Sequence, residues 1–331
     1  MTAFLAQRLG QAVIVLTVVS FLAFLLSSQI GDPVVSILGM QSTPEDRAIL
    51  RARLGLDDPF LIRYLSYMGN VLRGEFGISY ANQRPVADLI LARLPATLEL
   101  AGVALFMSLA LGLPIGIYAA IYRGHWTSDA ILTATVIGVS IPTFVIAILL
   151  IFAFSVTLGW LPSFGRGQVV QVGWWTTGFL TESGRRALLM PAAALAISQV
   201  ALVARLVRAE MIEVLRTDYI RFARARGLRP RIINLSLALR NTLIPVITVS
   251  GIQLGFLFAF AVVAEAVFQW PGIGLLFLQA LGSTDVPVIG AILLLTAAFF
   301  VAVNTVVDLL YAVVDPRLRA GEATGRPAGG H

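Results

Sequence analysis

Residues Thr217–Pro230, TDYIRFARARGLRP, lie between two long apolar segments, 187–204 and 241–264. Both apolar segments are candidate membrane spans, because crossing a hydrocarbon layer of about 30 Å takes roughly 20 consecutive apolar residues in a helix. The stretch between them is polar and basic. It therefore predicts a surface element that is held between two spans.

Local signals predict the shape of this element. Thr217 or Asp218 can cap the start of a helix, and Gly227 can adopt the left-handed conformation that ends one. Pro230 prevents the helix from continuing. The sequence therefore predicts a short, isolated helix over residues 219–226.

This helix presents apolar and basic groups together. A period of 3.6 residues places four residues on one face: Tyr219, Phe222, Ala223 and Arg226. Such a face fits a helix that docks into a protein groove. It equally fits an amphipathic helix that lies on anionic lipid.

The composition of the whole chain is that of an integral membrane protein. Of its 331 residues, 58% are apolar and 13% are charged, and the mean hydropathy is +0.87. A soluble domain carries about 25% charged residues, so a water-soluble globular enzyme is excluded. We predict an all-α polytopic protein whose six transmembrane helices lie at about 9–30, 96–122, 130–159, 187–204, 241–264 and 286–312.

The distribution of arginine predicts the orientation, because cytoplasmic loops carry an excess of positive charge. All 24 basic residues are arginines, and the stretches on the side of the two termini hold 14 of them, nine within 205–240. The other side holds ten, of which seven lie in the long segment 31–95 beside seven acids. Long segments cross regardless of charge, so the comparison becomes 14 against 3. Both termini are therefore expected in the cytoplasm.

The predicted spans divide the chain into four parts. These are a cytoplasmic N-terminus with the first span (1–30), an external segment (31–95), a five-helix core (96–318) that contains the cytoplasmic loop 205–240, and a disordered cytoplasmic tail (319–331). Within the external segment, Ser42–Pro44 predicts the start of a helix that stops before Gly55.

Missing residue types exclude several kinds of site. The chain has no cysteine and only two histidines, His125 and His331, so thiol chemistry and histidine-rich metal centres are excluded. Because it also has no lysine, it lacks the phosphate-binding loop of nucleotide-binding proteins. We therefore expect no catalytic site, no metal site and no bound cofactor. If the protein moves a solute uphill, the energy would have to come from a partner or from a proton or sodium gradient.

Three function classes can be weighed from the residues alone. A proton-coupled transporter or channel is the main alternative, but such proteins place ionisable residues in mid-helix. An intramembrane hydrolase would pair Ser140 or Ser250 with a base, and neither histidine lies in a span. Nucleic-acid binding is not expected, because the basic loop is tethered to the membrane and has few aromatic residues.

Three polar residues inside the spans are candidate functional contacts: Glu99, Asn304 and Asp308. Glu99 fits an interfacial acid at a helix N-terminus, where negative charge is favourable, or a contact to a substrate amine. Asp308 follows Asn304 by one helical turn, so both share a face that should contact protein. We favour a structural polar contact for this pair over a role in gating.

The basic loop resembles the "EAA" loop of ABC-importer permeases, in the form found in the dipeptide/oligopeptide/nickel family. Gly227 fits that pattern, whereas Arg221-Phe222-Ala223 stands where Glu-Ala-Ala is usual, and Arg240 stands where the general pattern has proline. Leu239–Pro245 continues the resemblance. It implies that a coupling helix contacts an ATP-binding subunit through Asp218, Tyr219, Ile220, Arg221, Phe222, Ala223, Arg224, Ala225, Arg226, Gly227 and Leu228.

Further motifs resemble the B-type permease subunit of this family along almost the whole chain. They are residues 31–33, 54–57, 72–77, 84–86, 93–100, 268–274, 307–311 and 315–317. The resemblance implies a type I importer (MetI-like) permease fold. The implied partners are a second permease subunit, two ATP-binding subunits that hold ATP and magnesium, and an external substrate-binding protein. The substrate stays open among dipeptides, longer peptides, glutathione, nickel chelates and sugars.

The segment between the last two spans is too apolar and too rich in glycine for a plain surface loop. The motif Trp270–Gly274 predicts a tight turn beside an interfacial tryptophan, and it suggests that the segment partly re-enters the membrane. One interpretation is anchoring at the membrane interface. The other, by analogy with related permeases, is an external gate or a contact to the substrate-delivering protein, formed by Glu265, Gln269, Trp270, Pro271 and Gly272.

Overall fold

The computed structural model describes residues 2–29, 34, 43–53 and 55–314. The predictions for the tail 319–331, for residues 31–33 and 315–317, and for Ser42 and Leu54 lie outside the described residues.

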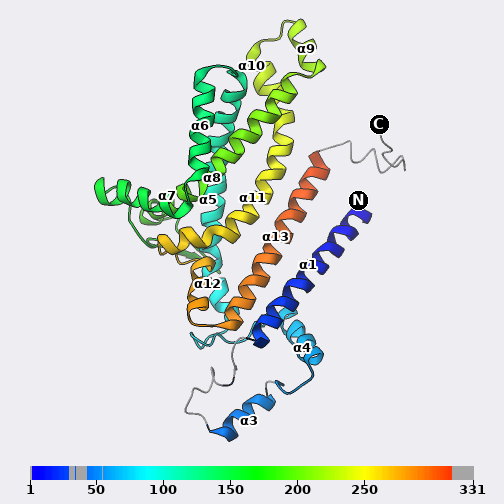
Figure 1. Ribbon diagram of the computed structural model, residues 1–331, viewed down its shortest axis with the longest axis vertical. Helices are drawn as coiled ribbons and strands as arrows, with labels where there is room; N and C mark the ends of the chain where they lie inside the picture. The colour runs from blue at the N-terminus through cyan, green and yellow to red at the C-terminus, as the bar shows by residue number, and fades with distance from the viewer. Residues whose placement is uncertain (1, 30–33, 35–42, 54, 315–331) are drawn as a thin grey trace.

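The described chain is a bundle of long helices with one small hairpin (Figure 1). The first helices are α1 (Thr2–Gln29), α3 (Pro44–Arg53), α4 (Phe60–Leu72), α5 (Val86–Ile121), α6 (Trp126–Ser140) and α7 (Thr143–Leu150), which continues as the π-helix η1 (Ile151–Thr157). The antiparallel strands β1 (Val170–Val172) and β2 (Trp175–Thr177) precede α8 (Glu182–Leu215). The rest comprises α9 (Asp218–Ala225), α10 (Pro230–Ile232), the π-helix η2 (Ile233–Ala238), α11 (Leu239–Val267), α12 (Ile273–Gly282) and α13 (Val286–Val314).

Within the described residues, five helices are long and apolar enough to cross a membrane, and a sixth span is formed if α6 and α7–η1 count together. The prediction of one continuous third span over 130–159 is wrong, because these two pieces are bent by 101°. Pro142 precedes α7 and forces Ile141 into an extended conformation, with φ −83° and ψ 124°. The bend therefore has a local cause.

Two predicted helix boundaries are also wrong. α8 continues beyond Ala204 to Leu215, so much of the predicted loop 205–240 is helical. Arginine is a good helix former, and a change to basic composition does not end a helix. α5 begins at Val86, ahead of the predicted Ala96, because Pro85 occupies its N-cap position.

α5 and α8 form the centre of the bundle, where small residues bring their backbones close together. A Cβ atom added to Gly112 would lie 2.8 Å from Cβ of Val203, and one added to Gly116 would lie 2.6 Å from the carbonyl oxygen of Ala204. Membrane helices use such small residues for close packing, since burial of apolar surface gives little advantage in lipid. This contact is the rigid core on which both ends of the bundle are built.

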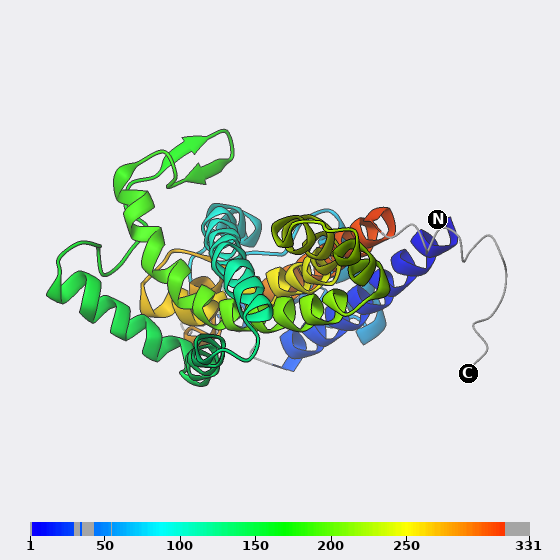
Figure 2. The ribbon, with the colours of Figure 1, turned by 90° about the horizontal axis from the view of Figure 1, so that it is seen from above.

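α1 lies at the flank, against α13 and α4 (Figures 1 and 2). The ring of Phe24 lies 5.2 Å from that of Phe60 and 5.6 Å from that of Tyr64, between ring centroids. α3 starts after Thr43, whose hydroxyl accepts a hydrogen bond of 3.2 Å from the backbone N–H of Asp46.

Candidate functional site

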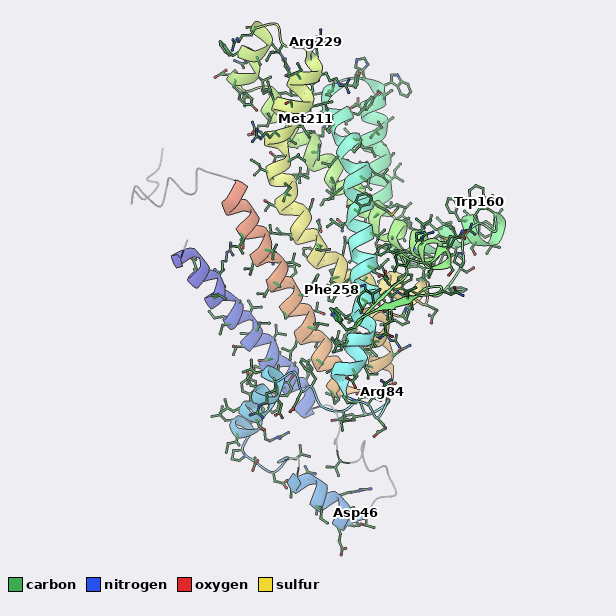
Figure 3. The ribbon with its side chains drawn as sticks, turned by 180° about the vertical axis from the view of Figure 1, so that it is seen from behind. Asp46, Arg84, Trp160, Met211, Arg229 and Phe258 are labelled. Carbon is green, nitrogen blue, oxygen red and sulfur yellow. The ribbon has the colours of Figure 1, made fainter. Side chains whose placement is uncertain are left out.

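Two groups of candidate residues lie at opposite ends of the bundle. α9 projects at one end, whereas α12 and the α11–α12 turn lie toward the other (Figure 1). Figure 3 marks the two ends by Arg229, close to α9, and Arg84, close to the start of α5. We call them the α9 end and the α12 end.

α9 ends as the sequence predicts, and its start differs. Gly227 has φ +73°, its N–H donates to the carbonyl of Arg224 at 2.9 Å, and the N–H of Leu228 donates to that of Ala223 at 3.2 Å. These two bonds form a Schellman motif. The hydroxyl of Thr217 donates to the carbonyl of Val214 at 2.6 Å and makes no capping bond to α9.

The predicted shared face of α9 is divided in the structure. Ile220 and Ala223 are buried, in a cluster with Met211 of α8 and Ile233 of η2. Tyr219 and Phe222 are exposed, and the guanidinium of Arg226 lies 5.6 Å from the centroid of the Phe222 ring. Ala223 therefore belongs to the anchoring face, because α9 packs back onto the end of α8.

The outer surface of α9 and of the segment that follows it, up to residue 231, is basic. Four exposed arginines form no ion pair among the described residues: Arg224, Arg226, Arg229 and Arg231. Arg221 pairs with Asp218 at 3.2 Å, with both side chains largely exposed. Exposed pairs contribute little, so this surface can accept an acidic partner.

At the α12 end, Glu265 of α11 is fully buried and caps α12. Its carboxylate accepts hydrogen bonds from the hydroxyl of Thr97 at 2.6 Å and from the N–H of Leu275 at 2.9 Å. The N–H of Ile273 in turn donates to the Thr97 hydroxyl at 2.8 Å. The first N–H groups of a helix have no partner within it and favour negative charge. Glu265 and Thr97 therefore join α11, α5 and α12.

The turn between α11 and α12 is tightly constrained. Gln269 takes the left-handed conformation with φ +49°, and the N–H of Trp270 donates to the carbonyl of Glu265 at 2.8 Å. A Cβ atom at Gly272 would collide with the Glu265 carboxylate. Glycine is therefore required at this position by close approach.

The expectation of an interfacial tryptophan is wrong. Trp270 is 1% exposed, and its indole N–H donates to the carbonyl of Ala96 at 3.0 Å. Gln269 is the exposed residue of the turn. The turn is held by burial of Trp270 against α5, not by a ring at the membrane interface.

Glu99 is not an interfacial acid at a helix end. It lies well inside α5, is buried, and forms an ion pair with Arg166 at 2.6 Å. The indole N–H of Trp175 also donates to its carboxylate at 3.3 Å. Arg166 donates to the backbone carbonyl of Thr176 at 2.6 Å, and its guanidinium lies 5.8 Å from the Trp270 ring centroid. The charge is thus neutralised within the chain.

Asp308 pairs with Arg8 of α1 at 3.0 Å. The neighbouring Asn304 is half-buried and has no side-chain hydrogen bond among the described residues. The structure therefore brings Asp308 to α1, and does not join it to Asn304.

Sequence reasoning missed the residues that complete these contacts. Thr97 and Arg166 carry no local signal, apart from the two glycines that flank Arg166. Asp285 was also missed; it is buried and accepts hydrogen bonds from the Ser79 hydroxyl at 2.5 Å and the Tyr80 N–H at 3.0 Å. These partners are 205 or more residues away in sequence from Asp285. Only the fold brings them together.

Comparison with known proteins places this architecture in a family. The model of the binding-protein-dependent transport system inner membrane component matches residues 112–320, and the model of its N-terminal region matches residues 1–101. The chain belongs to this permease family. The permease is accordingly a multi-pass inner membrane protein and a subunit of an ATP-driven importer, whose partners include ATP-binding subunits and a substrate-binding protein.

Relatives of the permease match over nearly its whole length. A putative peptide transport system permease protein of Brucella abortus is 38% identical over 322 residues, covering 96% of this chain and 99% of the relative. The di/tripeptide transport system permease protein DppB of Pseudomonas aeruginosa is 40% identical over 333 residues, covering 96% and 99%. The glutathione transport system permease protein GsiC of Escherichia coli K12 is 37% identical over 317 residues, covering 96% and 98%.

The predicted permease fold is confirmed by solved structures. Inward-facing crystal structures of the MetNI methionine ABC transporter align with the permease at TM-scores of 0.55 and 0.56, with 21% and 20% sequence identity. Each alignment covers 69% of this chain and 96% of the solved chain.

Proposed function

We propose that this permease imports peptides or closely related small solutes, delivered by an external substrate-binding protein. The observation that carries the proposal is the near full-length identity of 37–40% to permeases named for peptides, di/tripeptides and glutathione. Glutathione is itself a small peptide. The common chemistry of these substrates is therefore the amide-linked chain.

Energy enters through α9, which docks into a groove of an ATP-binding subunit together with Arg226, Gly227 and Leu228. Ile220 and Ala223 anchor α9 to α8 and to η2, which continues directly into α11. A displacement of α9 is therefore transmitted to the two long helices α8 and α11. Phe222 and the basic outer surface are left for the partner. ATP and magnesium are held by that partner, because this chain has no lysine for a phosphate-binding loop.

The α9 end faces the cytoplasm, and so do both termini. The arginine excess supports this orientation, and the start of α1 points toward the α9 end (Figure 1). In a chain without native cysteine, an Arg123→Cys variant, at an exposed position between α5 and α6 near the α9 end, should react with an impermeant maleimide only after the cells are permeabilised. Labelling in intact cells would reverse the orientation.

The turn at Glu265–Gly272 belongs to the external gate or to the docking surface of the substrate-binding protein. Its support is the exposed Gln269 on a turn held by Glu265, Trp270, Pro271 and Gly272 at the α12 end. A Gln269→Cys variant carrying a short cross-linker should capture the substrate-binding protein or the second permease. Absence of any adduct in every transport state would refute this role.

The second permease subunit is a different chain of the same fold, so the membrane part is a heterodimer. The resemblance to B-type subunits supports this assignment. Co-purification of the tagged permease with a second permease chain tests it, and recovery of a homodimer with full transport activity would contradict it.

The transport activity itself is tested in proteoliposomes. The assembled transporter, with its substrate-binding protein, should accumulate labelled tri-alanine only when ATP is supplied on the side of the α9 end. The permease alone should transport nothing. ATP-independent, proton-driven uptake by the permease alone would overturn the proposal in favour of a secondary transporter or channel.

A further inference from the structure

A cavity of about 440 Å³ lies where α7, α8 and α11 meet. Its volume falls in the range of small-molecule sites, about 300–1,000 Å³. Thr143 at the start of α7 lines it, so the bend before α7 helps to shape it. None of the nine described residues that line it is ionisable.

Two glutamines line this cavity together with the hydroxyl residues Thr143 and Ser198. Gln199 lies 17 residues after the first residue of α8 and 16 before its last, since α8 runs from 182 to 215. Gln253 lies 14 residues from either end of α11, which runs from 239 to 267. Both amides therefore lie inside the apolar parts of long helices, where an unsatisfied polar group is costly.

Neither glutamine amide has a hydrogen-bond partner among the described residues. Each amide offers an oxygen acceptor and two N–H donors. Polar residues at such depth in membrane proteins face a cavity or a transport path and mark functional sites. These two amides therefore have unused hydrogen-bonding capacity directed at a cavity.

The apolar wall of the cavity is aromatic. Phe256 and Phe260 line it, with ring centroids 6.1 Å apart and an interplanar angle of 21°. Their side chains are 43% and 62% exposed in the isolated chain. The cavity thus presents uncharged amides beside an open aromatic surface.

We propose that this cavity is a substrate-contact site on the transport path, in which Gln199 and Gln253 bind the backbone amides of a peptide. A peptide bond carries one N–H donor and one carbonyl acceptor, which match the glutamine amide in both directions. Phe256 and Phe260 contact apolar side chains of the peptide. The inference rests on the proposed peptide transport and adds the recognition chemistry of one site.

The absence of charge from the lining has a consequence for selectivity. A cavity without ionisable residues cannot neutralise the charged ends of a peptide, and burying an unpaired charge is costly. The site is therefore expected to bind the uncharged backbone between the two charged ends of the peptide. Such a site would accept peptides of different side chains, since every residue repeats the same amide.

The test compares tri-alanine with its depsipeptide, in which an ester oxygen replaces the backbone N–H of the middle residue. Uptake of both labelled compounds is measured in proteoliposomes that contain the assembled transporter. The variants are Gln199→Leu, Gln253→Leu and the double variant. Gln279→Leu is the matched control, because Gln279 is an exposed glutamine of α12 and does not line the cavity.

We expect the preference for tri-alanine over the depsipeptide to fall about tenfold in the double variant, which corresponds to about 1.4 kcal/mol. ATP hydrolysis and the preference of Gln279→Leu should match the wild type. Recognition by the substrate-binding protein is identical in all variants and cancels from the comparison. If the double variant does not assemble, the preference for tri-alanine over the depsipeptide is measured in each single variant instead.

Two results would overturn the inference alone. One is an unchanged preference in the variants while the wild type transports tri-alanine. The other is an equal loss of uptake for both compounds, which indicates damaged helix packing. Failure of the wild-type transporter to take up tri-alanine would instead overturn the proposed function, and the site with it.

Discussion

The guanidinium of Arg166 lies 2.6 Å from the carboxylate of Glu99, and both side chains are almost completely buried. This pair fixes the loop before the β1–β2 hairpin to the middle of the bundle. It also places a cation 5.8 Å from the ring of Trp270, the central residue of the α11–α12 turn. Two elements far apart in the sequence are thereby joined at one buried charge pair.

Removal of the cation should be strongly destabilising. Arg166→Met leaves the Glu99 carboxylate buried without a partner, and breaking a buried pair costs about 3–5 kcal/mol. Unfolding of the purified permease in detergent measures the loss. The control is Arg186→Met, which breaks the exposed pair with Glu182 and should cost less than about 1 kcal/mol. Equal effects of the two variants would disprove a structural role for the buried pair.

Gly272→Ala should destabilise the α11–α12 turn, because the new Cβ atom would collide with the Glu265 carboxylate. Forcing an extra methyl group into a packed site costs about 1–3 kcal/mol. Gly282→Ala is the matched control at the end of α12, where an added Cβ meets nothing within 4 Å. The same unfolding measurement compares the two, and a neutral Gly272→Ala would show that the turn can relax.

Arg224→Glu should abolish ATP-driven uptake while leaving membrane insertion intact, because it reverses charge on the outer surface of α9. Gly227→Asp should do the same, since it adds an acid and strains a position with φ +73°. Arg73→Glu makes the same charge change at an exposed site far from α9, and it should transport normally. Normal uptake by either α9 variant would refute the coupling role and favour lipid binding by α9.

Tyr67 of α4 should remain protonated at unusually high pH. Burial, together with the neighbouring Tyr64, raises the pKa of Tyr67 to about 12. In the unfolded chain tyrosine loses its proton near its ordinary pKa of about 10, so between these values the unfolded state binds fewer protons and stability falls as pH rises. The ultraviolet absorbance of the wild type and of Tyr67→Phe is measured as a function of pH. The difference between the two titration curves should show the ionisation of Tyr67 at a pH well above 10. A midpoint near pH 10 would contradict it.

Local features of the chain could be predicted because their causes are local. Apolar length indicated the spans, and Gly227 with Pro230 indicated where α9 ends. The bend before α7 has an equally local cause in Pro142, yet composition alone reads α6 and α7 as one apolar run. The end of α8 was missed because arginine is compatible with a helix, so a change to basic composition does not mark a helix boundary.

The class of protein, the positions of most apolar spans and the lack of a lysine for a phosphate-binding loop follow from the sequence alone. The tertiary structure decided which polar groups meet: Glu99 with Arg166, Glu265 with Thr97, and Gln199 with Gln253 around one cavity. Helix formation and capping depend on neighbours within about one turn. A buried polar group depends on whichever distant helix packs against it, and only the folded bundle specifies that partner.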